Sequence, residues 1–282
     1  MISARLFCPV LFLCGLGGVP ALAPQKVEAP SPAKYLGFDR NDYPGDDALA
    51  SLLKTFSFTG YWLSPPPGEK RSSWLGKRAL LRSQGFGFVV LFDGRASRSL
   101  HNSADARRKG ALDAQSAVKL AKEEGFAKDT VIFLDIEEGG RPPAPYHDYL
   151  QAWSDILAGT GYRAGVYCSA IPVDEGQGVR ITTAQDIQSH ITSPDLVYWG
   201  FDDTCPPSPG CAFPANPPPP AQSGFSAATI WQYAQSPRRK EFTARCAASY
   251  AADGNCYAPG DAHHRWFVDA NVATTRDPSS SH

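Results

Sequence analysis

Short apolar segments alternate with helix-forming segments along most of this 282-residue chain. Each apolar run has the length of a strand, and most of the intervening stretches carry apolar residues at helical spacing. The expected strands cover residues 35–39, 60–63, 86–92, 130–138, 163–170, 196–201, 228–234 and 266–272. The expected helices cover residues 46–56, 74–83, 103–125, 146–158 and 182–191. This alternation predicts an α/β fold of the closed (β/α)₈ TIM-barrel type in a single domain.

An open, doubly wound sheet is the competing architecture. It would usually carry a glycine-rich phosphate loop after the first strand, and Asp39-Arg40-Asn41-Asp42 is not such a loop. A proline-rich insertion follows the sixth expected strand at residues 204–224. It is long for a simple connection, so we expect it to form one wall of a cleft.

The first residues have the pattern of a secretory signal peptide. Arg5 precedes an apolar run from Leu6 to Val19, and small residues follow, which predicts cleavage after Ala21. We therefore expect a signal peptide at 1–21, a linker at 22–33, the barrel domain at 34–275 and a tail at 276–282. A membrane anchor is disfavoured because the apolar run is shorter than the roughly 20 residues that a spanning helix needs. The expected location is secreted or periplasmic.

The composition fits an ordinary globular protein. Apolar residues make up 43% of the chain and charged residues 20%, and the formal net charge is −1. This charge gives no electrostatic reason to expect nucleic acid or an anionic membrane surface as a partner. We expect a monomer that does not associate with a membrane once the signal peptide is removed.

Five of the seven cysteines lie beyond the predicted signal peptide. Cys205 and Cys211 form one close pair in loop-like sequence, and Cys246 and Cys256 form another. An exported chain meets an oxidising compartment, so two local disulfides are expected, although four cysteines allow three connectivities. Cys168 lies in a strand-like run and is expected to be a small buried residue, with a catalytic thiol as the alternative. No spacing indicates a zinc site, and we expect neither a metal nor a cofactor.

The strongest sign of chemistry is the pair Asp135 and Glu137, which ends an apolar strand-like run. Side chains alternate across a strand, so these two carboxyls point the same way, with backbone positions about 6.6 Å apart. Two acids that close repel each other, and one of them should keep its proton. One ionised and one protonated carboxyl is the combination that cleaves glycosidic bonds.

Further acids lie near the ends of other expected strands. Asp39 ends the first strand, and Asp269 lies in the eighth, where Asn271 shares its parity. In a closed barrel the first and eighth strands are neighbours, so Asp39 and Asp269 could meet at the mouth. Aromatic residues such as Tyr61 accompany them and suit the flat faces of sugar rings. A single strand-end acid is often only a turn or cap residue, and we expect that of Asp93.

Five motifs resemble the family 25 glycoside hydrolases, which are peptidoglycan-cleaving lysozymes with a barrel fold. A related bacterial family of secreted, glycoside-hydrolase-like proteins is the closer match. The motifs are Gly-Phe-Asp at 37–39, Leu-Asp-Ile-Glu at 134–137, Gly-Val-Tyr at 165–167, Trp-Gln-Tyr at 231–233 and Val-Asp-Ala-Asn at 268–271. The resemblance covers roughly residues 35–275.

The resemblance implies a role for each matching residue. Glu137 would be the general acid, and Asp135 would stabilise the developing charge or orient the substrate. The implied substrate-binding residues are Asp39, Asp269, Tyr167, Trp231, Asn271 and Tyr61. The family 18 chitinases carry another Asp two residues before their Asp-x-Glu pair, where this chain has Phe133. Arg40 also departs from the lysozyme pattern, and it could pair with Asp39 or with an acidic group of the substrate.

Three functions are compatible with these residues. The leading hypothesis is an exported glycoside hydrolase that cleaves bacterial cell-wall glycan, a polysaccharide. The second is a non-catalytic glycan-binding module with a degenerate active site. The third is a metal-dependent phosphodiester hydrolase in which Asp39, Asp135, Glu137 and Asp269 would hold Mg²⁺ or Ca²⁺.

Overall fold

The computed structural model describes residues 34–204, 218–237, 253–258 and 261–280. The expected signal peptide and linker, most of the proline-rich insertion and Cys205, Cys211 and Cys246 lie outside these ranges. The two expected disulfides therefore stay predictions. In the described part of the chain, no helix is both long enough and apolar enough to cross a membrane.

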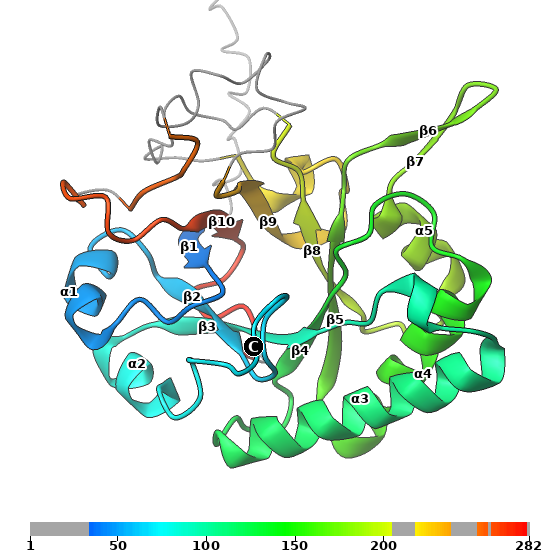
Figure 1. Cartoon of the computed structure of the whole chain (residues 1–282), viewed down its shortest axis with the longest axis horizontal. Helices are drawn as coiled ribbons and strands as arrows, with labels where there is room; N and C mark the ends of the chain where they lie inside the picture. The colour runs from blue at the N-terminus through cyan, green and yellow to red at the C-terminus, as the bar shows by residue number, and fades with distance from the viewer. Residues whose placement is uncertain (1–33, 205–217, 238–252, 259–260, 281–282) are drawn as a thin grey trace, which may run out of the picture. The chain divides into compact units, whose positions relative to one another are not determined.

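Eight strands close into a barrel (Figure 1). The strands are β1 (Tyr35–Asp39), β2 (Phe58–Trp62), β3 (Gly87–Asp93), β4 (Val131–Asp135), β5 (Arg163–Ser169), β8 (Val197–Phe201), β9 (Ala228–Ala234) and β10 (Asp269–Ala273). Their order around the barrel is β1-β10-β9-β8-β5-β4-β3-β2. The mixed α/β barrel expected from the sequence is thus confirmed, with each expected strand found within a few residues of its place.

The regular (β/α)₈ arrangement is not confirmed, because the last strand runs the other way. β10 pairs antiparallel with both β9 and β1, whereas the other neighbouring strands pair parallel. A strand that enters from the opposite end needs no crossover helix to bring the chain back. This agrees with the irregular sequence before β10, in which no helix was expected.

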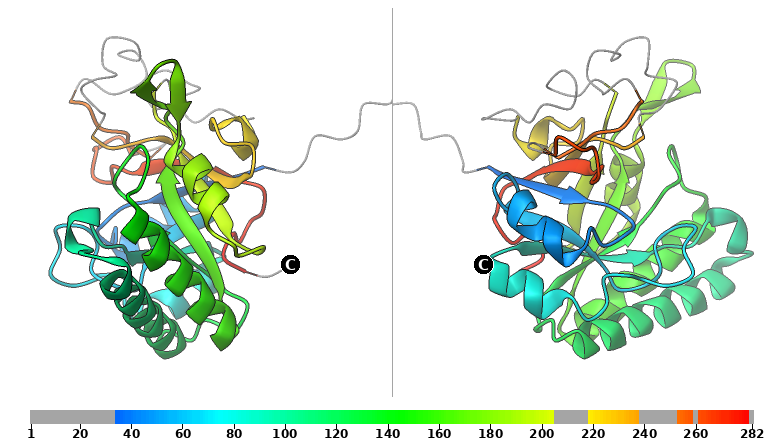
Figure 2. Two further views of the ribbon diagram at one scale, coloured as in Figure 1. Left: turned by 90° about the vertical axis from the view of Figure 1, so that its right-hand side faces the viewer. Right: turned by 60° about the vertical axis from the view of Figure 1, so that its left-hand side comes forward.

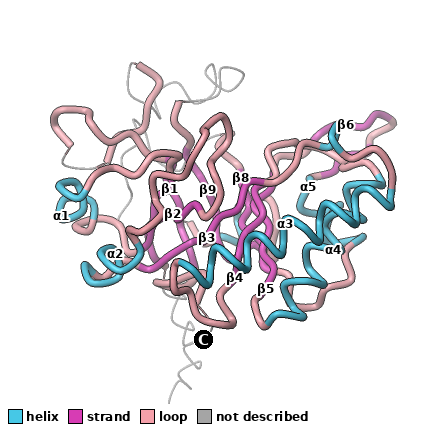
Figure 3. Tube along the Cα trace, turned by 60° about the horizontal axis from the view of Figure 1, so that its bottom comes forward, coloured by secondary structure: helices cyan, strands magenta, loops and turns pink. Residues whose placement is uncertain are grey.

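The helices lie outside the strands (Figure 3). They are α1 (Leu49–Leu52), α2 (Arg78–Gln84), α3 (Ser103–Glu123), α4 (Ala144–Thr160) and α5 (Thr183–His190). Asn102 caps α3 by accepting from Asp105 N, and Thr182 caps α5 in a reciprocal pair with Gln185. Single 3₁₀ turns lie at Asp46–Ala48, Ser97–Ser99 and Pro220–Gln222. The first expected helix is much shorter than its apolar spacing indicated.

A hairpin that the sequence did not predict projects from the barrel between β5 and α5 (Figure 2). Its strands are β6 (Val173–Gly176) and β7 (Val179–Ile181), which pair antiparallel. Nearly all its side chains are exposed, so the apolar alternation that marks a packed strand is missing.

The barrel interior is filled by large side chains beside glycines. Phe58 lies against Gly37, where a Cβ would come within 2.1 Å of the ring. Phe133 lies against Gly165 in the same way, at 2.5 Å, and packs edge-on to Trp199. These layers close the barrel below its mouth, so a ligand can enter only above them.

The chain end packs beneath the barrel, at the amino ends of β3 and β4. Asp277 Oδ1 accepts from Phe88 N at 2.8 Å, and Ser279 Oγ accepts from Val90 N at 2.9 Å. The carbonyl of Ser279 accepts from Val131 N. Residues set apart as a tail in the sequence thus hydrogen-bond to two barrel strands.

Candidate active site

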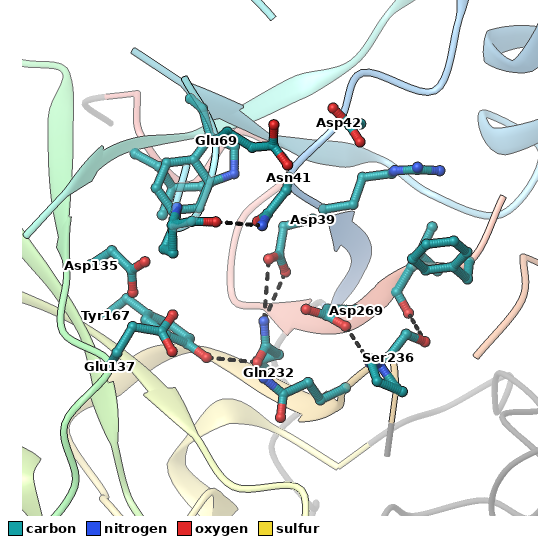
Figure 4. A pocket seen from close by; sticks show the side chains of 18 of the residues that line it. Asp39, Asn41, Asp42, Glu69, Asp135, Glu137, Tyr167, Gln232, Ser236 and Asp269 are labelled. Carbon is teal, nitrogen blue, oxygen red and sulfur yellow. Dashed lines mark hydrogen bonds between the residues drawn. The ribbon is translucent and has the colours of Figure 1, made fainter. Parts of the chain in front are cut away.

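A pocket of about 420 Å³ opens at the mouth of the barrel (Figure 4). Six of its lining residues are acidic: Asp39, Asp42, Glu69, Asp135, Glu137 and Asp269. Four are aromatic: Trp62, Tyr167, Trp199 and Phe267. The volume lies in the range of small-molecule sites, and the combination of flat rings with acids is suited to a polar ligand that has apolar faces.

Asp135 and Glu137 have different surroundings although they are two residues apart. Asp135 is the last residue of β4 and is 3% exposed, whereas Glu137 lies in the following loop and is exposed. Burial raises the pKa of Asp135 well above its usual value, and the charges of Glu137 and Asp93 add to the rise. The surroundings of Asp135 therefore favour its protonated form.

Asp93 adds negative charge next to this pair. It pairs in register with Asp135 on the neighbouring strand. Burial raises the pKa of Asp93 to about 6, with Glu137 and Asp113 contributing. Asp93 is the last residue of β3, and its backbone N–H donates to Ser64 Oγ at 2.7 Å.

Asp39 is held by two amide side chains at the centre of the pocket. Gln232 Nε2 donates to its Oδ1 at 3.0 Å, and Asn271 Nδ2 donates to the same oxygen at 2.6 Å. Gln232 in turn accepts from Tyr167 at 2.8 Å, and Asn271 accepts from Trp199 at 3.0 Å. Side chains from five strands, β1, β5, β8, β9 and β10, thus form one hydrogen-bonded network that holds the carboxyl of Asp39 in place.

The pKa values of Asp39 and Asp269 are also raised. Burial brings the pKa of Asp39 to about 6, against the lowering effect of its two amide donors. Burial and the charge of Asp39 raise the pKa of Asp269 well above its usual value, although Ser236 N donates to its Oδ1. The two residues lie opposite each other in the register of β1 and β10. Asp269 reaches the mouth because it begins an antiparallel strand.

The structure brings together most of the residues singled out in the sequence. Asn271 holds Asp39 but does not itself line the pocket, and two further residues lie elsewhere. Tyr61 points out of the barrel, donates to Glu124 and packs against Phe126. Trp231 also lies outside the pocket lining and donates from Nε1 to the carbonyl of Asp202 at 3.0 Å. Neither residue can touch a ligand in this pocket.

Other residues of the site were not among the predicted substrate-binding residues. Trp62, one position from Tyr61, lines the pocket, and its buried Nε1 has no hydrogen-bond partner among the described residues. Gln232 was quoted only as part of a motif, yet it links Tyr167 to Asp39. A strand buried on both faces gives no alternation from which the inward residue could be chosen.

A possible metal-binding cluster lies away from the pocket. Ligand atoms of His147, Asp186 and His190 lie within 4.8 Å of one another. However, one oxygen of Asp186 accepts from Arg141 at 2.8 Å, and His147 Nε2 lies 2.6 Å from the other. The two imidazole rings are stacked, so their nitrogen lone pairs do not converge. The arrangement is that of a hydrogen-bonded ion network rather than a metal centre.

Comparison with known proteins supports the resemblance stated from the motifs. Residues 70–206 match the family model described as Rv2525c-like, glycoside hydrolase-like domain, a range that includes Asp135, Glu137 and Tyr167. The relation to this glycoside-hydrolase-like family is thereby confirmed. A comparison with curated proteins found no match.

One similar solved structure reaches a TM-score above 0.5 and shows a shared fold, and two others are similar at lower scores. An uncharacterized protein of B. stearothermophilus is 19% identical with a TM-score of 0.53, over 85% of this chain and 95% of that one. The Tat-secreted protein Rv2525c of Mycobacterium tuberculosis is 15% identical with a TM-score of 0.48, over 88% and 96%. A family 25 glycosyl hydrolase from Bacillus anthracis is 14% identical with a TM-score of 0.48, over 85% and 88%.

Proposed function

We propose that this protein is an exported glycoside hydrolase that cleaves bacterial cell-wall glycan in the manner of a lysozyme. The observation that carries the proposal is the pairing of a buried Asp135 with an exposed Glu137 in one pocket. Cleavage of a glycosidic bond needs one carboxyl that gives a proton and other carboxylates that stabilise positive charge. Because these two acids have unequal environments, they can take these two different roles.

In the proposed reaction, the glycosidic oxygen approaches Glu137 from the open side of the pocket. Asp135, whose pKa is raised by burial, passes its proton to Glu137, and Glu137 delivers it to the leaving oxygen. Asp135 is then ionised and lies close enough to stabilise the developing oxocarbenium charge. Water completes the hydrolysis and returns a proton to the pair. Asp39 and Asp269 lie on the opposite wall and bind the sugar.

The other pocket residues are suited to holding a sugar. Tyr167 and Trp199 are buried at the bottom of the pocket, where their polar atoms are engaged with Gln232 and Asn271. The buried N–H of Trp62 lacks an acceptor among the described residues and suits a hydroxyl or an acetamido carbonyl of the substrate.

The test is the release of reducing sugars from purified peptidoglycan by the mature protein. Glu137→Gln preserves the shape of the side chain but removes the acid, so the rate should fall about 10²- to 10⁴-fold. Glu138→Gln is the matched control, because Glu138 is adjacent and exposed and accepts from Ser97 N instead of lining the pocket. This control should cleave at the wild-type rate.

Two outcomes would contradict the proposal. Equal rates for Glu137→Gln and wild type would remove the acid role from Glu137. Binding of glycan by the wild type without any released sugar would instead identify a non-catalytic glycan-binding module.

A further inference from the structure

Arg40 is the only basic residue among the described residues that line the pocket. It directly follows Asp39 at the end of β1, and its guanidinium lies over the Phe267 ring, 5.0 Å from the centroid. Phe267 itself is 41% exposed at the mouth. The cation is therefore held at the entrance of an otherwise acidic site.

Arg40 makes no hydrogen bond or ion pair with any described residue. Its Nε is buried without a partner. Burial lowers its pKa, and the negative charges of Asp42 and Asp269 only partly oppose that effect. An arginine stays charged in proteins, so the cation loses water without gaining a direct counter-ion.

Such an arrangement is costly unless a ligand completes it. Stacking on Phe267 engages the face of the guanidinium and leaves the N–H groups at its edge available. These groups match the two oxygens of a carboxylate. A phosphate carries more negative charge than a carboxylate, and Asp42 and Asp269 beside Arg40 would repel it while only one cation attracts it. A carboxylate with a single negative charge therefore fits this position better.

We propose that Arg40 binds a carboxylate substituent of the glycan, so that the preferred substrate is an acidic rather than a neutral polysaccharide. This inference rests on the proposed glycan-cleaving function and specifies the substrate of the same pocket. The raised pKa values of Asp39, Asp135 and Asp269 lessen the negative charge that an incoming anion meets in the pocket.

The test compares one glycan in two chemical states. Peptide-free peptidoglycan oligosaccharides, which carry lactyl carboxylates, are used either intact or after their carboxylates have been reduced to hydroxymethyl groups. Dissociation constants are measured by calorimetry at pH 5 for the full chain. The variants are Arg40→Met, which keeps contact with Phe267 but removes the charge, and Arg71→Met, an exposed control outside the pocket.

Arg40→Met should weaken binding of the intact glycan about 10- to 100-fold, as expected for loss of a charge-assisted hydrogen bond. Binding of the reduced glycan should hardly change, and Arg71→Met should bind both like the wild type. Equal weakening for both glycans, or no weakening for either, would overturn the inference. Thermal unfolding of each variant verifies that it is folded.

This result can be separated from the hydrolase proposal. If Arg40→Met weakens binding of the intact glycan alone but no sugar is ever released, the proposed carboxylate recognition is supported and the proposed hydrolase function is rejected. If sugar is released but intact and reduced glycans bind equally well to all variants, hydrolysis stands and carboxylate recognition fails.

Discussion

At the scale of single residues, burial divides the acids of the pocket into two groups. Asp39 and Asp135 are buried and Asp269 is half-buried, and desolvation is the largest cause of their raised pKa values. Glu137 lies in a loop and is exposed. The buried acids favour their protonated forms, whereas the exposed Glu137 can contact the substrate. The donor and the acceptor of the proton are both carboxyl groups, and their different burial gives them different roles.

Asp39→Asn should remove part of the pH dependence of stability. The folded protein raises the pKa of Asp39 from 3.8 to about 6, so the stability it contributes is present below pH 4 and is lost as pH rises through 6. The shift of about two units corresponds to a loss of about 3 kcal/mol. The Asn variant mimics the protonated form and should be more stable than wild type at pH 7, but equal to it at pH 3.5.

Urea unfolding at both pH values measures this difference. Asp42→Asn provides the control, because Asp42 is exposed at the rim and its replacement should leave the pH dependence unchanged. The interpretation fails if wild type and Asp39→Asn lose the same stability between pH 3.5 and 7.

At the scale of elements, the close contact of α3 and α4 supports the β4 side of the site. Gly110 of α3 lies directly against the carbonyl of Tyr149 in α4, where a Cβ would come within 2.2 Å of the oxygen. Tyr149 donates to Asp113, which also pairs with Arg95 through two bonds of 2.6 Å. Arg95 follows β3, so the helix pair is tied to the loop beside Asp93.

Gly110→Ala should destabilise the protein although alanine favours helices. Forcing the two helices apart costs about 1–3 kcal/mol, which exceeds the gain of about 1 kcal/mol in helix propensity. Gly159→Ala in α4 is the control, because a Cβ added at Gly159 would meet no other atom within 4 Å and the backbone there is not left-handed.

Thermal unfolding distinguishes these two alanines. Gly110→Ala should lower the midpoint, and Gly159→Ala should raise it or leave it unchanged. A raised midpoint for Gly110→Ala would mean that the helices separate at no cost.

A second element-scale feature is the ion network around Asp186, which joins three segments. Arg141 from the loop after β4 pairs with Asp186 of α5 and with Glu175 of the β6–β7 hairpin. His147 of α4 also lies against Asp186, which is fully buried. The hairpin is thereby linked to the loop that follows Glu137. Its exposed strands have little other packing to hold them.

At the scale of the whole barrel, the two ends of the barrel have different roles. The mouth gathers the acids, whereas the chain end closes the opposite end below β3 and β4. Gly87 makes this closure possible, because a Cβ there would come within 2.1 Å of the Arg276 carbonyl. Barrels of this kind usually carry their chemistry at the mouth and their stabilising contacts at the base.

Ser279→Ala should destabilise the whole barrel, because it leaves the buried N–H of Val90 without an acceptor. Ser279 is 1% exposed, and an unsatisfied buried donor costs about 1–3 kcal/mol. Ser280→Ala is the control, since its hydroxyl donates to Asp277 and is partly exposed.

Urea unfolding should show a clearly larger loss for Ser279→Ala than for Ser280→Ala. Similar small losses would show that the chain end does not support the barrel. Cleavage of peptidoglycan, measured below the unfolding transition, should be unaffected by either change because the acids lie at the other end.

The sequence by itself indicated the positions of the strands along the chain, a closed α/β barrel and the place of Asp135 near a strand end, because strand positions follow from local periodicity and turn residues. It also indicated that Cys168 is buried, and burial indeed raises the pKa of its thiol to about 12. Such a thiol is not a nucleophile near neutral pH.

Only the tertiary structure showed that β10 is antiparallel to its neighbours, that Asp135 is buried while Glu137 is exposed, and that Trp62 rather than Tyr61 lines the pocket. Strands of a covered barrel are buried on both faces, so their sequence shows no alternation from which the inward side can be identified. Strand direction and desolvation depend on partners far along the chain. A pocket lined by residues of all eight barrel strands is therefore determined by packing that no local sequence pattern records.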